Sequence, residues 1–484
     1  MAYLHLSISE LHNKLLNNEV TPLDLVKEAI EKAKSDKNNA FEYICEKEAL
    51  EQVSKLDINK KNNLLWGIPY ALKDNYSTKD IPTTASSNIL NGYTPIFDAE
   101  VTKRLADQGA ILIGKTTLDE LAMGGSGTTG HLGKTFNPWD KTHTHIVGGS
   151  SCGSASVTAS AIVPFAIGSD TGDSIRKPAS HACLVGLKPT WGRISRFGLF
   201  PFAPSMDHVG FFTRNVYDSA ILLSTLAGRD EKDATSSANK VDDYLSFGRS
   251  IKGKRFGYIK EIFDSITNVN IKNTFLDLLN KLKEKGAEII ECHLDETLCK
   301  AIYTTYIVIS CAEATSNNAN LDGIKFGNRQ DGETYEEIVI NTRTNGFSEL
   351  IKRRFVIGSY SLLKSNQEEL FIKAQKVRHL IVDKINEILA VCDSIILPAS
   401  PTTAPKFEGS NMDKLSDEYL IADNWMAIGN FGGFPSITIP LGFENNLPFG
   451  VNLTNKSFDE KNLFTLAKAV EDITGLADIL PEGI

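Results

Sequence analysis

The sequence predicts an α/β fold organised as one large compact unit. From about residue 64 onward, short apolar runs punctuated by glycine and proline alternate with longer stretches of helical pattern, and this alternation is typical of α/β cores. The chain has 484 residues, of which 42% are hydrophobic, so it can bury a large core. No low-complexity segment or block of charge divides it. We therefore expect a single domain over residues 1–484.

Residues 1–63 are predicted to form a helical wrap around the core. In TPLDLVKEAIEKAK (21–34), Thr21 is placed as a helix N-cap and Pro22 at the first helical position. We assign no chemistry to this region.

The core is predicted over about residues 64–220. Its apolar runs are LLWGIPYALKD, AILIGKTTLDELAM, SASVTASAIVPFAIGSD and HACLVGLKPTWGRIS. Such short runs, bounded by turn-forming residues, indicate buried strands joined to helices.

A second α/β portion, residues 221–484, is expected to complete the sheet and the substrate pocket. KGKRFGYIKEI predicts a strand, and NTFLDLLNKLKEKGAEIIECH predicts a helix followed by a strand. Long helices are predicted in SELIKRRFVIGSYSLLK and in KAQKVRHLIVDKINEILAVCDSIILPAS, the second ending in a buried strand. A strand in PSITIPLG and a helix in FTLAKAVEDITG close the chain.

Composition limits the classes of function. The formal net charge is -9, with Lys and Glu spread along the chain, so strong binding to nucleic acid by this chain alone is not expected. Seven cysteines without CxxC spacing indicate a reducing compartment. No apolar run approaches the roughly 20 residues of a membrane span, and the first residues lack the pattern of a signal peptide. We expect a cytoplasmic protein without membrane contact.

A candidate nucleophile lies in GSDTGDSIRKP (168–178), where Ser174 sits in a run of small, turn-forming residues. Of the nine histidines, only His143, His145 and His181 are near this motif, none in a GxSxG elbow, and the residues alone leave them open as bases. Lys73 is another candidate, because it ends an apolar run that would desolvate it. To act near neutral pH it must lose about 3 pKa units, roughly 4 kcal/mol. Its other interpretation is a surface lysine beside a strand.

A second small-residue turn, GGSSCGS (148–154), opens a predicted helix. Its small residues are similar to those of a phosphate-binding loop, but it lacks the GK[ST] ending of a P-loop and does not fit GxGxxG. The turn can instead present a second hydroxyl.

These motifs resemble the amidase signature family. GGSSCGS, GSDTGDSIR and GLKPT are similar to that family's GGSSGGS, GSDTGGSIR and GLKPT, and the KDN of residues 73–75 is similar to its lysine motif. The resemblance covers nearly the whole chain. SELIKRRFVIGSYSL, KAQKVR and the segment around Asp423 are most similar to the branch that serves as the glutaminase subunit of tRNA-dependent amidotransferases.

The resemblance implies the fold and the catalytic groups. The fold would be a mixed central β-sheet covered by helices on both faces. Ser174 would be the nucleophile, Ser150 a bridging serine on a cis peptide, and Lys73 the base.

The resemblance also implies an oxyanion hole and a glutamine site. Backbone N–H groups of Thr171, Gly172 and Asp173 would face the oxyanion. Asp170 and Arg176 flank this turn and are expected to pair in a structural role.

Three side chains are expected to bind glutamine. By resemblance, Arg354 and Asp423 would bind its α-carboxylate and α-ammonium, and Tyr306 would lie near its amide. Taken as residues alone, Arg354 has the alternative interpretation of a solvated helix charge, with Arg353 as a neighbouring competitor, and Asp423 that of a helix cap.

The sequence departs from the family pattern near the nucleophile. Asp173 and Cys152 replace glycines, and His181 and Ala182 stand where an aromatic residue and a cysteine are common. A carboxylate directed into the oxyanion hole would oppose catalysis, although the backbone N–H of Asp173 remains and Asp tolerates a positive φ better than most residues.

Three functions therefore stay open. The first is a glutaminase subunit that supplies ammonia to convert glutamate misattached to tRNA into glutamine, with service to aspartate on tRNA(Asn) undecided. The second is a stand-alone amidase for another small amide, and the third is a silent scaffold.

Partners and cofactors follow from the first function. A B subunit would bind tRNA, ATP and Mg²⁺ and receive the ammonia, and a C subunit would complete a heterotrimer. No cofactor or metal is expected in this chain.

Overall fold

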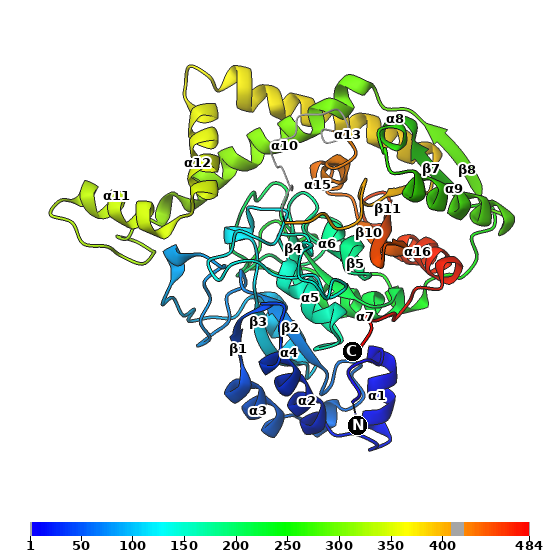
Figure 1. Cartoon of the computed structure of the whole chain (residues 1–484), viewed down its shortest axis with the longest axis horizontal. Helices are drawn as coiled ribbons and strands as arrows, with labels where there is room; N and C mark the ends of the chain where they lie inside the picture. The colour runs from blue at the N-terminus through cyan, green and yellow to red at the C-terminus, as the bar shows by residue number, and fades with distance from the viewer. Residues whose placement is uncertain (1, 408–420, 484) are drawn as a thin grey trace.

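The structure, a computed structural model, describes residues 2–407 and 421–483. Its framework is an 11-stranded mixed sheet in the order β1-β3-β2-β4-β6-β5-β10-β11-β9-β7-β8. Helices pack around this sheet, which runs through the middle of the molecule (Figure 1). The predicted α/β fold is confirmed.

The strands are β1 (Phe41–Ile44), β2 (Pro69–Lys73), β3 (Ile111–Thr116), β4 (Phe165–Asp170), β5 (Val185–Lys188), β6 (His208–Thr213), β7 (Arg255–Ile259), β8 (Glu288–Cys292), β9 (Ser394–Pro398), β10 (Ser436–Glu444) and β11 (Leu447–Thr454). The helices are α1 (Ile8–Leu16), α2 (Pro22–Lys34), α3 (Glu46–Ser54), α4 (Glu100–Asp107), α5 (Cys152–Ala159), α6 (Arg176–His181), α7 (Val216–Leu226), α8 (Lys260–Asp264), α9 (Val269–Glu284), α10 (Glu296–Asn317), α11 (Tyr335–Gly346), α12 (Glu349–Leu362), α13 (Lys373–Val391), α15 (Ile428–Phe431) and α16 (Glu460–Thr474).

The apolar runs of the predicted core form the strands that position the site. LLWGIPYALKD contains β2, which pairs in parallel with β3 on one side and with β4 on the other. All five residues of β2 and all six of β4 are buried. A continuous apolar run is what a strand covered on both faces requires, because neither face meets water.

The second portion extends the same sheet. β10 pairs with β5, and β9 pairs with β11, so strands from both parts of the chain meet at the centre. The predicted strand and helix–strand segments form β7, α9 and β8, and the two long predicted helices form α12 and α13.

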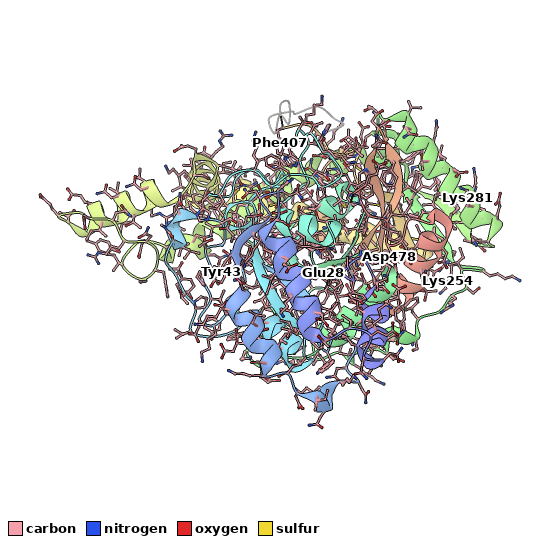
Figure 2. The ribbon with its side chains drawn as sticks, turned by 60° about the horizontal axis from the view of Figure 1, so that its bottom comes forward. Glu28, Tyr43, Lys254, Lys281, Phe407 and Asp478 are labelled. Carbon is pink, nitrogen blue, oxygen red and sulfur yellow. The ribbon has the colours of Figure 1, made fainter. Side chains whose placement is uncertain are left out.

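The N-terminal region is helical except for one strand. α2 begins as predicted, with Thr21 as N-cap and Pro22 in the first turn. Its Glu28, labelled in Figure 2, accepts hydrogen bonds from the backbone N–H groups of Tyr3 and Leu4 and so holds the first described residues against the helix. β1 was not predicted, because four residues are too few to show an alternation, and it pairs antiparallel with β3 at the sheet edge.

Helices α10, α12 and α13 gather on one side of the sheet, and α11 projects from them (Figure 1). α10 and α12 cross closely at Gly358, where an added Cβ would lie 2.1 Å from the carbonyl oxygen of Cys311. This crossing fixes the two helices that contain Tyr306 and Arg354. No helix in the described parts of the chain is long and apolar enough to cross a membrane.

Candidate active site

Lys73 ends β2 and is fully buried. Its Nζ lies 2.8 Å from the Oγ of Ser150, 3.0 Å from that of Ser151 and 2.9 Å from that of Ser169. Burial lowers the pKa of Lys73 to about 7, because a charged ammonium is poorly solvated in the protein interior. The lysine predicted as base is therefore desolvated as that role requires.

Ser150 lies in the turn that leads into α5. The peptide between Gly149 and Ser150 is cis, and the Ser150 side chain is fully buried. A Cβ at Gly149 would lie 2.0 Å from Oδ2 of Asp119, so this position accepts only glycine. The same Asp119 oxygen accepts hydrogen bonds from the N–H groups of Ser126 and Gly127, which ties a neighbouring loop to the turn.

Ser174 lies between the end of β4 and the start of α6, almost fully buried. Its carbonyl oxygen accepts a hydrogen bond of 3.3 Å from the N–H of Ser151, which joins the two serine-containing turns. Asp170 and Arg176 bracket the nucleophile turn and form the predicted pair, with Nη2–Oδ1 at 2.9 Å and Nε–Oδ2 at 3.1 Å. Both side chains are fully buried, so the pair holds the turn and does not reach solvent.

The hydroxyls around Lys73 have distinct roles in hydrogen bonding. Ser151 donates to the carbonyl oxygen of Ser169, so its Oγ can only accept from Lys73. The Oγ of Ser169 accepts from Asn75 and again from Lys73. A neutral lysine has two N–H bonds and one lone pair, so these two acceptors leave the lone pair for Ser150. The arrangement can draw a proton from Ser150.

The three candidate histidines contact other groups. His181 is buried, its Nε2 lies 3.4 Å from the Oγ of Ser400, and burial lowers its pKa to about 3. His145 pairs with Asp140 at 2.8 Å, and His143 stacks on Phe136. None of these contacts involves the serines around Lys73.

The predicted oxyanion turn presents backbone N–H groups. Those of Thr171, Gly172 and Asp173 form no hydrogen bond with another described residue, whereas the side chain of Thr171 donates to Asp207 at 2.7 Å and the carbonyl of Gly172 accepts from Arg176. Such free donors beside a nucleophile suit a developing oxyanion.

The carboxylate of Asp173 is paired with a lysine. Its Oδ2 lies 2.8 Å from the Nζ of Lys177, one helical turn further along. The backbone of Asp173 is not in the left-handed region, so a tolerance for positive φ is not needed to explain this residue.

Tyr306 and Arg354 approach the oxyanion turn from α10 and α12. The Tyr306 ring lies 3.0 Å from where a Cβ at Gly172 would stand, so the glycine allows the ring to pack against the turn. The guanidinium of Arg354 lies 5.7 Å from the ring centroid of Phe202, and its Nη1 is buried without a hydrogen-bond partner among the described residues. Arg353 is exposed. The structure therefore distinguishes Arg354 from its neighbour.

Lys177 links Asp423 to the nucleophile turn. The Lys177 Nζ donates to Oδ1 of Asp423 at 3.2 Å and to its carbonyl oxygen at 2.9 Å. Burial raises the pKa of the Asp423 carboxyl, and the nearby Lys177 opposes that shift. Every residue predicted for the site lies in the described parts of the chain.

Sequence reasoning missed Ser151, Ser169, Asn75 and Lys177. Ser151 adjoins Ser150, and Asn75 follows Lys73 by two residues, within the quoted KDN motif. Ser169 reaches Lys73 only because β2 and β4 are neighbours with Leu72 opposite Ile167. That pairing is not visible in the sequence.

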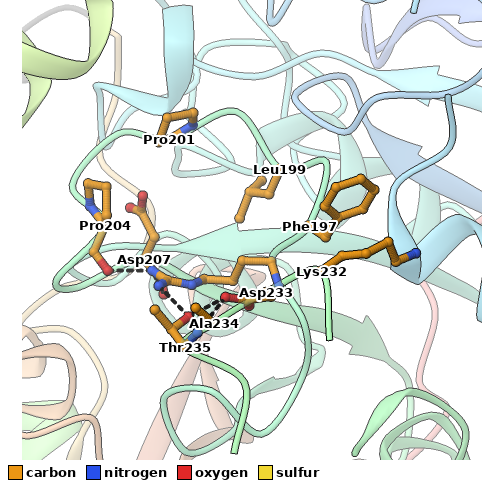
Figure 3. Close-up of a pocket in the computed structure, with 10 residues that line it drawn as sticks. Phe197, Leu199, Pro201, Pro204, Asp207, Lys232, Asp233, Ala234 and Thr235 are labelled. Carbon is orange, nitrogen blue, oxygen red and sulfur yellow. Dashed lines mark hydrogen bonds between the residues drawn. The ribbon is translucent and has the colours of Figure 1, made fainter. Parts of the chain in front are cut away.

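A pocket of about 310 Å³ lies beside this region (Figure 3). Arg196 lines it and donates hydrogen bonds to Thr235 and to the carbonyl of Pro204, and the Lys232 ammonium lies over the ring of Phe197. Asp207 lines the pocket and also accepts from Thr171, which connects the pocket wall to the predicted oxyanion turn. The lining does not include the serines or Lys73. No group of three or more His, Cys, Asp or Glu in the described residues could hold a metal ion.

Comparison with known proteins agrees with this geometry. The Amidase family model matches residues 24–464. The A subunit of glutamyl-tRNA(Gln) amidotransferase from Pediococcus pentosaceus is 41% identical, covering 100% of this chain and 99% of that protein. The protein of the same name from Streptococcus uberis is 40% identical, covering 98% and 97%.

Solved structures of similar proteins give the same result. The A subunit of glutamyl-tRNA(Gln) amidotransferase from Thermotoga maritima has a TM-score of 0.77 and 34% identity, covering 99% of this chain and 98% of that one. A solved amidase has a TM-score of 0.81 at 25% identity, covering 97% and 100%. With the family model matching most of its length, this chain belongs to the amidase signature family.

Proposed function

We propose that this chain is the glutaminase subunit of a tRNA-dependent amidotransferase. It hydrolyses glutamine to glutamate and supplies ammonia for the conversion of glutamate misattached to tRNA(Gln) into glutamine. The observation that carries the proposal is the contact of the buried Lys73 Nζ with Ser150 at 2.8 Å, in a chain similar over its full length to the A subunits of such enzymes. This contact also argues against a silent scaffold.

The reaction begins with proton transfer. Neutral Lys73 takes the proton of Ser150 as Ser150 takes that of Ser174, and the Ser174 Oγ attacks the side-chain amide carbon of glutamine. The oxyanion is stabilised by the backbone N–H groups of the 171–173 turn. The proton held by Lys73 returns through Ser150 to the amide nitrogen, ammonia leaves, and a glutamyl ester remains on Ser174.

Hydrolysis of the ester completes the cycle. A water molecule gives its proton to the relay and its oxygen to the ester carbon, and Ser174 recovers its proton as glutamate leaves. Release of ammonia and of glutamate is therefore equimolar.

Recognition of glutamine supports this function over a stand-alone amidase. Glutamine has an α-carboxylate and an α-ammonium, which need one cationic and one anionic partner. Arg354 offers a buried Nη1 without a partner among the described residues. Asp423 is held beside the nucleophile turn by its contact with Lys177. A pocket for a neutral amide needs neither charge.

The partners follow from the reaction. Ammonia must reach a second centre, where a B subunit binds tRNA and uses ATP with Mg²⁺ to activate the misattached glutamate, and a C subunit joins the two in a heterotrimer. The proposed hydrolysis of glutamine by this chain uses no cofactor. We propose the cytoplasm as its compartment.

The deciding experiment compares glutamine hydrolysis by the purified chain with hydrolysis after addition of the B and C subunits and glutamyl-tRNA(Gln). We expect ammonia release to accelerate in the full assembly and amidated tRNA to form. A chain that prefers neutral aliphatic amides to glutamine, and that the assembly does not accelerate, would instead be a stand-alone amidase.

A further inference from the structure

Three charged side chains form a bridge beside the nucleophile. Lys177 contacts Asp173 at 2.8 Å and Asp423 at 3.2 Å. Asp173 immediately precedes Ser174, and the N–H of Lys177 donates to the carbonyl of Asp173 at 2.9 Å, so the first turn of α6 fixes the position of this pair. The bridge therefore lies at a set distance from the reacting serine.

This bridge changes the charge that Asp423 presents to a substrate. An ammonium group beside a carboxylate cancels most of its attraction for a second ammonium, because the two cations repel each other at short range. With Lys177 present, Asp423 alone would offer a nearly neutral pair to the α-ammonium of glutamine. Asp173 supplies a second carboxylate, so that two carboxylates and one ammonium have a formal charge of minus one.

Exposure and neighbours leave this charge accessible beside the predicted oxyanion turn. The side chain of Asp173 is 21% exposed and that of Asp423 29%, whereas Lys177 is 10% exposed. The lysine is thus the inner member, and the two carboxylates keep accessible surface. The ring of Tyr306 packs against Gly172, the residue before Asp173, with ring atoms 3.0 Å from where a Cβ at Gly172 would stand, so the bridge adjoins the turn that this ring contacts.

We propose that Asp173 is a specificity-determining residue, which together with Asp423 binds the α-ammonium of the substrate across Lys177. The proposal rests on the proposed glutaminase function. It accounts for the carboxylate beside the oxyanion turn, where the family pattern has glycine: Asp173 restores the negative charge that Lys177 removes from Asp423.

The test compares glutamine with glutaramate, which lacks only the α-ammonium. In the full chain, Asp173→Asn should lower the ratio of kcat/KM for glutamine to kcat/KM for glutaramate by about tenfold, mainly through the KM of glutamine. Because the ratio uses one active site, changes in the chemical step common to both substrates cancel. The double variant Asp173→Asn with Lys177→Gln should recover the ratio to within about threefold of wild type, because Asp423 then acts without a competing cation.

The matched control is Asp277→Asn. Asp277 and Lys281 form the same Asp-to-Lys pair at i and i+4, 2.7 Å apart, on the exposed face of α9, where Figure 2 labels Lys281 far from the centre. This variant should leave the ratio unchanged. Thermal unfolding midpoints of all variants separate loss of fold from loss of recognition.

Each outcome decides between named interpretations. An unchanged ratio in Asp173→Asn, or a double variant no better than the single one, would overturn the proposal and leave the Asp173–Lys177 pair as a brace for α6. A wild-type chain that hydrolyses glutaramate as readily as glutamine would contradict the proposed function itself, whatever the variants do.

Discussion

The pKa of Lys73 predicts the pH dependence of the reaction. Only the neutral amine can accept the proton of Ser150, so kcat/KM for glutamine should follow the neutral fraction of Lys73. With a pKa of about 7 in the folded chain, activity should rise with pH and level off above neutrality. The neutral fraction is about 0.09 at pH 6 and about 0.91 at pH 8, a change of roughly tenfold, whereas a lysine with an ordinary pKa of about 10.4 would still gain about tenfold per unit near pH 9.

The assay is ammonia release from glutamine at low substrate concentration between about pH 5.5 and pH 9.5, where the assignment of lysine as base predicts one inflection. His181→Asn should keep this inflection, because the pKa of His181 lies near 3 and its ring is neutral throughout. Ser169→Ala should move the inflection to lower pH, since the Ser169 hydroxyl accepts a hydrogen bond that stabilises the charged form of Lys73. A rate that still rises at pH 9, or an inflection that disappears with His181, would refute the assignment of Lys73 as base.

Three further predictions concern single side chains. Ser174→Ala should abolish both turnover and the glutamyl adduct seen in the intact mass of quenched enzyme, and Ser150→Ala should lower the rate by several orders of magnitude; a near-normal rate in either variant contradicts the relay. Asp173→Gly should change the single-turnover rate of acylation by less than about tenfold, or roughly 1.4 kcal/mol, and a gain of hundreds of fold would mean that the carboxylate suppresses catalysis. Arg354→Ala should cost about 2 to 5 kcal/mol in kcat/KM for glutamine with much less effect on acetamide, while the exposed Arg353→Ala serves as control; equal effects of the two variants would count against a carboxylate site at Arg354.

The fold was predictable where the pattern is local. The run containing β2 is apolar up to Lys73 because both faces of that strand are buried, and α2 shows its cap and its proline within two residues. β1 has only four residues, and α10 was not predicted because its YTTYIVIS run is rich in β-branched residues that favour strands. Its 22 residues are helical because the helix packs against α12 and α13.

The site was predictable where a motif or a resemblance named its residues. Ser174 was visible from its turn alone, but the sequence could not choose between Lys73 and a histidine as its base. That choice depends on burial and on β2 lying beside β4, which are tertiary facts. The contact of Lys177 with Asp423 spans 246 positions of sequence, and no local pattern could have indicated it.

The proposed catalytic residues lie on the sheet and its turns, whereas two of the proposed substrate-binding residues lie on helices. This separation suggests how the substrate specificity of such an enzyme can be changed. The proposed proton relay is built from β2, the turn before α5 and the turn after β4, whereas Tyr306 and Arg354 come from the crossing of α10 and α12. The bond-breaking machinery can thus stay intact while α10 and α12 are exchanged for a pair with different charge and shape. A designer seeking a new amide substrate would graft helices and leave the strands untouched. Asp173, which adjoins the nucleophile, and Asp423 would be redesigned together with them.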